Sequence, residues 1–159
     1  MLLYHGSNVE VSHPKICKRL RNLDFGNGFY LTSSKKQASK WSKSVTRRKR
    51  KGEPTLNSYY FDESFLSNLN VLKFNTADEN WLEFVVRNRK GLPITTQYDL
   101  VIGPVANDST LDVINDYMAG RFNKKIAVEL LMPQNLTDQY TFLTQNALQY
   151  LVFKGSEQV

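Results

Sequence analysis

The segment from Tyr98 to Gly103 places the tightest constraint on the fold of this chain. Its residues, Tyr-Asp-Leu-Val-Ile-Gly, form a nearly continuous apolar run that Pro104 ends. A strand of this composition is buried on both faces, which predicts a central position in a covered sheet. Shorter strands and helices alternate loosely around it, without the regular spacing of a doubly wound fold. The sequence therefore predicts an α+β fold with mixed or mostly antiparallel sheets and short flanking helices.

The remaining elements follow from apolar periodicity and from glycine and proline breakers. Strands are predicted over residues 2–5, 29–31, 56–61, 71–74 and 139–143, with an edge strand at 152–153. Helices are predicted over residues 35–49, 79–89, 109–118, 125–131 and 145–151. Residues 9–23 are expected to be loop with at most one helical turn. No repeat or linker divides the chain, so residues 1–159 are expected to form one domain.

Composition narrows the class of protein. A chain of 159 residues with 41% apolar and 12% aromatic residues can bury a core without disulfides or structural metals. The single cysteine, Cys17, excludes an internal disulfide and favours a reducing compartment, where we interpret it as a packing residue. There is no long apolar run and no signal-peptide pattern near Met1, so a cytoplasmic location without a membrane partner is expected.

The charge is unevenly distributed. Residues 1–51 contain 13 Lys and Arg but only 2 Asp and Glu, whereas residues 52–159 contain 8 and 13. This asymmetry predicts an anionic partner, which is nucleic acid, an acidic inhibitor protein or a phosphate-bearing cofactor. The basic run at residues 47–51 has two interpretations, a solvated helix end or a surface for a phosphate backbone.

Several common site types are absent from the sequence. There is no GxxxxGK[ST] phosphate loop, no GxGxxG opening a helix and no nucleophile elbow around a serine. The tripeptide Asp24-Phe25-Gly26 lacks the other kinase motifs. Two histidines, His5 and His13, and one cysteine show no ligand spacing, so no metal is expected.

Three short motifs remain. His5-Gly6-Ser7 ends the first predicted strand, and Gly26-Asn27-Gly28-Phe29-Tyr30 forms a glycine turn that leads into the second. Trp41 follows Tyr30 by eleven residues on the next helix, and Asp138-Gln139-Tyr140 begins a late strand. Together they resemble the motifs of the ADP-ribosyltransferase superfamily, in the His-Tyr-Glu branch of diphtheria toxin and the poly-ADP-ribose polymerases. Here glutamine replaces the glutamate.

The match is closer to a family of small bacterial proteins of unknown function within that superfamily, with a His-Tyr-Gln triad. It spans about residues 4 to 151 and includes Trp81-x-x-Phe84-Val85-x-x-Asn88-Arg89 and Tyr98 to Asp108. The resemblance implies a split-sheet ADP-ribosyltransferase fold and cleavage of NAD⁺ between nicotinamide and ribose, with no metal. It also suggests a toxin that an antitoxin protein holds in check.

The resemblance assigns roles to seven residues. Tyr30 and Trp41 would stack on nicotinamide, and the Gly6 backbone would bond its carboxamide, with Ser7 as a weaker candidate. His5 would bond a ribose hydroxyl, and Gly28 would let the ligand approach the main chain. Gln139 would bond a ribose hydroxyl but has no charge and cannot act as a base. The implied catalytic set is therefore His5, Tyr30 and Gln139.

These roles predict a mono-ADP-ribosyltransferase that modifies nucleic acid or protein, and they argue against polymer elongation. A non-catalytic module for NAD⁺ or ADP-ribose, an NAD⁺ glycohydrolase and a nucleic-acid-binding protein without a nucleotide site stay open as alternatives. The segment 132–138 is the expected acceptor-recognition loop. Asp138 is a possible substitute carboxylate that strand alternation would aim at the other face. Asn107 and Asp108 are either site residues or a helix cap.

Overall fold

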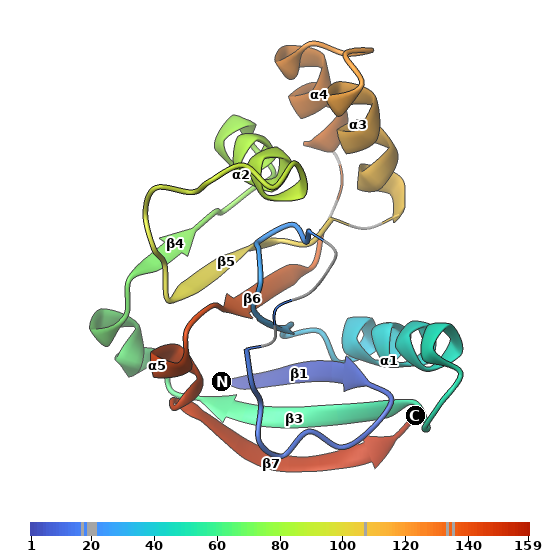
Figure 1. Ribbon diagram of the computed structural model, residues 1–159, viewed down its shortest axis with the longest axis vertical. Helices are drawn as coiled ribbons and strands as arrows, with labels where there is room; N and C mark the ends of the chain where they lie inside the picture. Colours follow the sequence, from blue (N-terminus) through green and yellow to red (C-terminus); the bar gives the residue numbers. More distant parts are fainter. Residues whose placement is uncertain (17, 19–21, 107, 133, 135) are drawn as a thin grey trace.

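A computed structural model describes residues 1–16, 18, 22–106, 108–132, 134 and 136–159. Two β-sheets and flanking helices make up an α+β fold, as the sequence predicted. In Figure 1 the two sheets lie one above the other, with helices α2, α3 and α4 beyond the upper sheet and α1 beside the strand β1.

The lower sheet contains three antiparallel strands in the order β1 (Leu2–Ser7), β3 (Thr55–Phe61) and β7 (Leu151–Gln158). Leu3 lies opposite Tyr59, and Gly6 lies opposite Leu56. Since side chains alternate along a strand, Leu3 and His5 share one face of β1, and Tyr4 and Gly6 share the other.

The upper sheet has the order β2 (Phe29–Leu31), β6 (Asp138–Phe142), β5 (Leu100–Pro104) and β4 (Val71–Lys73). The pairs β2–β6 and β6–β5 are antiparallel, whereas β4–β5 is parallel. Leu100, Val101 and Ile102 are buried, and their strand has a neighbour on each side. The predicted central position of this segment is confirmed, and the sheets are mostly antiparallel.

The α-helices are α1 (Lys35–Lys49), α2 (Glu79–Arg89), α3 (Asp108–Met118), α4 (Lys124–Leu131) and α5 (Gln145–Leu148). Side-chain caps define several helix starts: Ser34 accepts from the Gln37 N–H, and Asp78 accepts from the Trp81 N–H. Trp81 and Val85 of α2 are fully buried. The Trp81 indole also donates to the Pro104 carbonyl at 2.9 Å, which ties α2 to β5.

Two apolar clusters hold these layers together. The first lies between the sheets, and its larger members are Leu3, Phe29, Leu31, Tyr59, Phe61, Leu100 and Phe142. The second lies between the upper sheet and the helices α2, α3 and α4, and its members include Phe25, Trp81, Val85, Val101, Ile114 and Leu131. The upper sheet is therefore covered on both faces, as a strand like β5 requires.

The structure corrects two sequence predictions near the end of the chain. The predicted helix over 145–151 ends at Leu148, and the edge strand at 152–153 is the eight-residue strand β7. A 3₁₀-helix, η1 (Glu63–Asn68), was also missed. Among the described residues, no helix combines the length and the apolar composition that a membrane crossing requires.

Candidate functional site

The three strands that contain the motifs lie next to one another. β1 meets the end of β2 through Tyr4 and Thr32, which exchange backbone hydrogen bonds of 2.8 and 3.0 Å. β2 in turn pairs with β6, with Tyr30 opposite Thr141. Segments that are about 25 and 110 residues apart in the sequence thus form three consecutive neighbours, β1, β2 and β6, where the two sheets join.

His5 is held at this junction by two contacts. Its Nδ1 lies 2.8 Å from the Tyr30 carbonyl oxygen, and its ring packs on Phe29 with centroids 4.3 Å apart. A carbonyl oxygen only accepts, so Nδ1 must be the protonated nitrogen. In the neutral ring, Nε2 is then the hydrogen-bond acceptor, which is the form that can bind a sugar hydroxyl.

Gly6 is required by the packing of α1. A Cβ at this position would lie 2.1 Å from the Ala38 carbonyl oxygen and 2.6 Å from the Ser42 nitrogen, so no other residue fits without moving the helix. Backbone groups of alternate residues face the same strand edge. The N–H and C=O of Gly6 therefore face the same edge as those of Tyr4, toward β2. Ser7 follows as a buried residue with 7% exposure.

Tyr30 joins the strand β2 to the glycine turn that precedes it. Its hydroxyl donates to the Gly26 carbonyl at 2.6 Å and accepts from the Phe25 N–H at 3.2 Å. The side chain is half-buried and packs against the second apolar cluster. These contacts fix the phenol through its hydroxyl group. Its ring lies on the face of β2 that meets the second apolar cluster.

Gly28 has a clear packing role, whereas Trp41 lies outside both apolar clusters. A Cβ on Gly28 would lie 2.6 Å from Thr141 Cγ2 and 2.7 Å from the Phe142 carbonyl oxygen, so Gly28 permits the close packing of the turn on β6. Trp41 is half-buried on α1 and belongs to neither apolar cluster. The stacking of nicotinamide between Tyr30 and Trp41 stays a prediction.

Gln139 is the least satisfied polar residue of this region. It lies opposite Gly103 in the strand pair β6–β5 and is only 3% exposed. Among the described residues its side-chain Nε2 has no hydrogen-bond partner, and neither has Oγ1 of the fully buried Thr141, two residues along the same face. A buried amide donor without a partner is costly in a folded protein and marks a place where a ligand or water can bind.

Asp138 has a structural task. Its carboxylate accepts from Thr32 Oγ1 at 3.1 Å, from the Ser33 N–H at 2.8 Å and from Ser33 Oγ at 2.5 Å. These bonds fasten the start of α1 to the start of β6. They also occupy the carboxylate that sequence analysis considered as a substitute for a catalytic glutamate. Burial raises the pKa of the neighbouring Tyr140, and the Asp138 carboxylate adds to this effect.

Other residues of the family pattern anchor the glycine turn. Asp24 accepts from Arg89 Nε at 2.5 Å, and both side chains are less than one-fifth exposed. Asn22 donates to the Arg89 carbonyl, and Asp99 accepts from Thr144 Oγ1 at 2.6 Å. The sequence motifs included Asp24, Arg89 and Asp99 without assigning them a role, and they did not include Asn22. The opposite charges of Asp24 and Arg89 are visible in the sequence, but only the fold shows that the two side chains form a pair.

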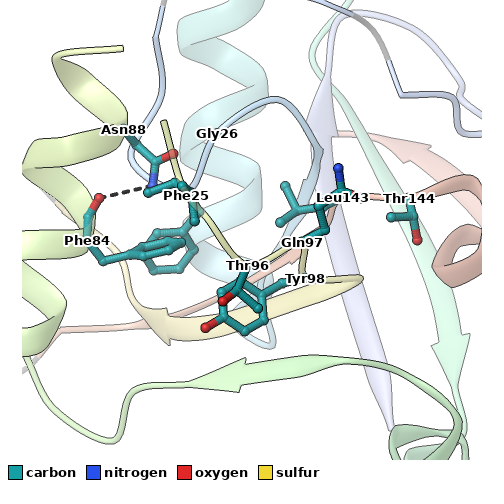
Figure 2. A pocket seen from close by; sticks show the side chains of 10 residues that line it. Phe25, Gly26, Phe84, Asn88, Thr96, Gln97, Tyr98, Leu143 and Thr144 are labelled. Carbon is teal, nitrogen blue, oxygen red and sulfur yellow. Dashed lines mark hydrogen bonds between the residues drawn. The ribbon is translucent and has the colours of Figure 1, made fainter. Parts of the chain in front are cut away.

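Phe25 and Gly26 of the glycine turn help to line a cavity of about 360 Å³. Figure 2 shows Phe84 and Asn88 of α2 facing Phe25 and Gly26, with Tyr98 and Leu143 on the opposite wall. Asn88 is held there by donation to the Phe84 carbonyl at 3.0 Å. None of the residues that line this cavity belongs to the predicted set of His5, Tyr30, Trp41 and Gln139, so it is separate from the predicted nicotinamide slot.

The basic run at residues 47–51 closes α1. Arg47, Arg48 and Lys49 form its last turn, and Arg50 caps it in the left-handed conformation with a φ of 50°. Lys49 donates to Asn8 Oδ1 at 3.1 Å. The five side chains are exposed and suit the negative end of the helix dipole, which supports the interpretation as a solvated helix end.

Some sequence predictions lie wholly or partly outside the described residues. Cys17 and Asn107 are not described, and the segment 132–138 lacks residues 133 and 135. Asp108 is the first residue of α3, and its side chain is not described. Within the described part of the chain, no group of three or more His, Cys, Asp and Glu side chains is arranged to hold a metal ion.

Comparison with known proteins gives one match. Residues 1–153 match the model of the family described as protein of unknown function (DUF3990). The chain has no match among the curated proteins or among the solved structures. Because the family model covers nearly the whole chain, including all three motif strands, this protein belongs to the DUF3990 family.

Proposed function

We propose that this protein is an NAD⁺-dependent mono-ADP-ribosyltransferase. The observation that supports the proposal is the adjacency of β1, β2 and β6, the strands that contain His5, Tyr30 and Gln139. Each motif alone is unspecific, and their meeting in space is the condition that the sequence resemblance requires. The protein would work in the cytoplasm, with NAD⁺ as substrate, a nucleic acid or protein as acceptor and an antitoxin as a further partner.

The reaction breaks the bond between nicotinamide N1 and ribose C1′. The electron pair of that bond leaves with nicotinamide, which becomes neutral, and the sugar develops positive charge. An acceptor nucleophile then forms a new bond to C1′ and releases a proton to solvent. Such a reaction depends mainly on holding NAD⁺ in a reactive geometry and on stabilising the charge of the sugar.

The residues at the junction fit the parts of NAD⁺. His5 Nε2, fixed as an acceptor by the bond from Nδ1 to Tyr30, would bind a ribose hydroxyl. The Gly6 backbone groups that face the β2 edge would bind the carboxamide. The unpartnered Nε2 of Gln139 would donate to a ribose oxygen, which satisfies a group that the ligand-free fold leaves buried and unbonded.

Gln139 also limits the chemistry. A neutral amide cannot accept the proton of the attacking nucleophile, so it supports transfer to an acceptor that needs little activation. The Asp138 carboxylate does not replace it, because Thr32 and Ser33 occupy its oxygens. A single transfer therefore fits these residues better than elongation of a polymer.

The same observations support a second candidate, a non-catalytic module that binds NAD⁺ or ADP-ribose. The buried amide of Gln139 provides a binding group, and the neighbouring Asp138 carboxylate is already occupied and provides no base. An NAD⁺ glycohydrolase is a third candidate, in which water takes the place of the acceptor. The three differ in turnover and in the fate of the ADP-ribose.

The test is nicotinamide release from NAD⁺ by the purified chain and by His5→Asn. The asparagine amide can still donate to the Tyr30 carbonyl but provides no acceptor at the position of Nε2, so release should fall by about 100-fold. His13→Ala is the matched control, because His13 is exposed and contacts only the neighbouring Ser12 among the described residues. It should leave release unchanged.

Labelled NAD⁺ in a cell extract then separates the candidates. A transferase transfers the label to nucleic acid or protein, which digestion with nuclease or protease distinguishes. Release without labelling would indicate the glycohydrolase. Binding of NAD⁺ without release would indicate the module, and the absence of both binding and release would refute the proposal.

A further inference from the structure

A groove of about 550 Å³ runs along the first half of α1, beside the residues that lead into β6. Three lysines line it, Lys36, Lys40 and Lys43, together with serine, glutamine and threonine side chains. Among the described residues of its lining there is no carboxylate and no large apolar side chain. Ammonium, hydroxyl and amide groups are the side chains that proteins place against phosphates.

Two of the groove lysines, Lys36 and Lys43, keep an unneutralised charge within the described part of the chain. The sequence of α1 contains no acidic residue. Within the described part of the chain, Lys36 and Lys43 have no carboxylate partner, whereas Lys35 on the same turn pairs with Glu157 at 2.6 Å and Lys124 pairs with Glu79 and Glu83. Lys36 and Lys43 are thus arranged for an external anion.

The lysines continue into a longer stripe. Lys36, Lys40, Lys43 and Arg47 follow one another at spacings of four, three and four residues, which puts them on one face of α1. Eleven residues of helix extend over about 16 Å. This exceeds what the two phosphates of a dinucleotide need, and it suits a chain of phosphates.

The groove lies next to the candidate site. Thr137, which lines it, precedes Gln139 by two residues. Ser34, the N-cap of α1, lies beside Ser33, which Asp138 fastens to β6. An anion that follows α1 toward its N-terminus therefore arrives at the start of β6, where the acceptor has to meet the sugar.

We propose that the groove binds the phosphates of a single-stranded nucleic acid and that this strand is the acceptor of ADP-ribose. The second clause rests on the proposed function. A single strand is specified because a base inside a duplex is not accessible to chemistry until it leaves the stack. The stripe would hold the strand by its backbone, and a base or sugar would reach the junction of β1, β2 and β6.

The experiment measures fluorescence anisotropy of labelled single-stranded DNA and RNA of about 20 nucleotides, a length that exceeds the stripe. The variant replaces Lys36, Lys40 and Lys43 with glutamine. Its matched control replaces Lys73, Lys90 and Lys125, exposed lysines of other elements, and so has the same net charge. The groove variant should lose at least tenfold in affinity, and its salt slope should fall by about 2. The control should change much less.

Three results would overturn the groove assignment. An equal loss in both triple variants would mean that net charge alone attracts the strand. Poly-glutamate that competes equally and responds equally to the substitutions would indicate an acidic protein segment. Loss of NAD⁺ binding in the groove variant, with oligonucleotide binding intact, would indicate a pyrophosphate site.

Nicotinamide release separates the two proposals. Release by the wild-type chain without groove-dependent oligonucleotide binding would overturn the groove and leave the transferase. Groove-dependent binding without any release would overturn the acceptor role and the transferase together, and would leave a nucleic-acid-binding surface. Groove-dependent binding with release, and with label on the bound strand, is the expected result.

Discussion

At the scale of single residues, Gln139 combines two properties that rarely occur together. It is 97% buried, and its Nε2 donor has no partner in the part of the chain that the structure describes. Residues with this combination lower the stability of a fold, and they persist where a ligand supplies the missing bond. Gln139 is therefore the residue at which stability and function should separate most clearly.

Gln139→Met tests this separation. Methionine has a similar size and no polar hydrogen, so the variant should gain about 1 kcal/mol in free energy of unfolding. Nicotinamide release should fall by about 100-fold, because the donor to the ribose is lost. Urea unfolding and the release assay measure the two effects. A variant that is both less stable and fully active would show that the amide serves only the fold.

Gly6 differs from Gln139, because the packing of the fold alone requires a glycine at this position. Gly6→Ala should lower the free energy of unfolding by about 3 kcal/mol, since the new Cβ overlaps the α1 backbone at Ala38 and Ser42. Gly120→Ala is the control: its Cβ meets nothing within 4 Å, and only the φ of 77° opposes it, at about 1 kcal/mol. Equal losses in urea unfolding would show that α1 adjusts its position easily.

At the scale of elements, the glycine turn depends on α2 for its position. The pair Asp24–Arg89 is largely buried, with side-chain exposures of 14% and 17%, and it joins the glycine turn to α2 directly. Asn22 and Gly91 reinforce the contact, since Asn22 donates to the Arg89 carbonyl. Tyr30 is fastened to the same turn through Gly26, so α2 indirectly positions a candidate site residue.

A double-mutant cycle with Asp24→Asn and Arg89→Met measures this link. The coupling energy should be about 1–3 kcal/mol, because the partners are desolvated and each single variant leaves the other unpaired. The exposed pair Lys35–Glu157, with exposures of 59% and 51%, should give a much smaller coupling energy in the same cycle, because solvent screens both charges. Similar values for the two pairs would contradict the anchoring role.

The elements with strong periodicity were predictable from the sequence. β5 and α2 have apolar patterns that only a buried strand and an amphipathic helix satisfy, and their boundaries agree within two residues. β7 was not predictable, because Lys154, Gly155 and the polar residues after them show no apolar alternation. It forms a strand since β3 offers an unpaired edge.

The candidate site was predictable in part. Its residues were proposed from motif order, but their surroundings were not predicted. Neither the bonds of Asp138 to Ser33 nor the exposure of Gln139 follows from local sequence, because Ser33 is 105 residues from Asp138 and Gln139 is covered by the strand that contains Gly103. The groove along α1 was visible only as excess positive charge, until the fold brought Thr137 beside the helix.

At the scale of the whole molecule, the chain leaves the lower sheet after β3, adds β4, β5 and β6 to the upper sheet, which already contains β2, and then returns as β7 (Figure 1). β7 covers one edge of β3, and Phe153 meets Tyr59 ring to ring at 5.6 Å. The sheet that presents His5 is therefore incomplete until residues of the last strand have joined it.

A chain that ends at Tyr150 should not unfold cooperatively in urea, because the edge of β3 and the first apolar cluster are both exposed. Adding a peptide of residues 149–159 should restore the transition by pairing along β3. A sharp transition in the shortened chain without the peptide would show that β7 is an accessory strand.

The return of the chain has a consequence for protein synthesis. About 90 residues separate the end of β3 from the start of β7, so a ribosome needs roughly 5–18 s to supply the missing strand. During that interval the edge of β3 that β7 later covers is free. The sheet that presents His5 is therefore completed only after residues 151–158 have been synthesised, so any function that depends on this sheet begins late in translation.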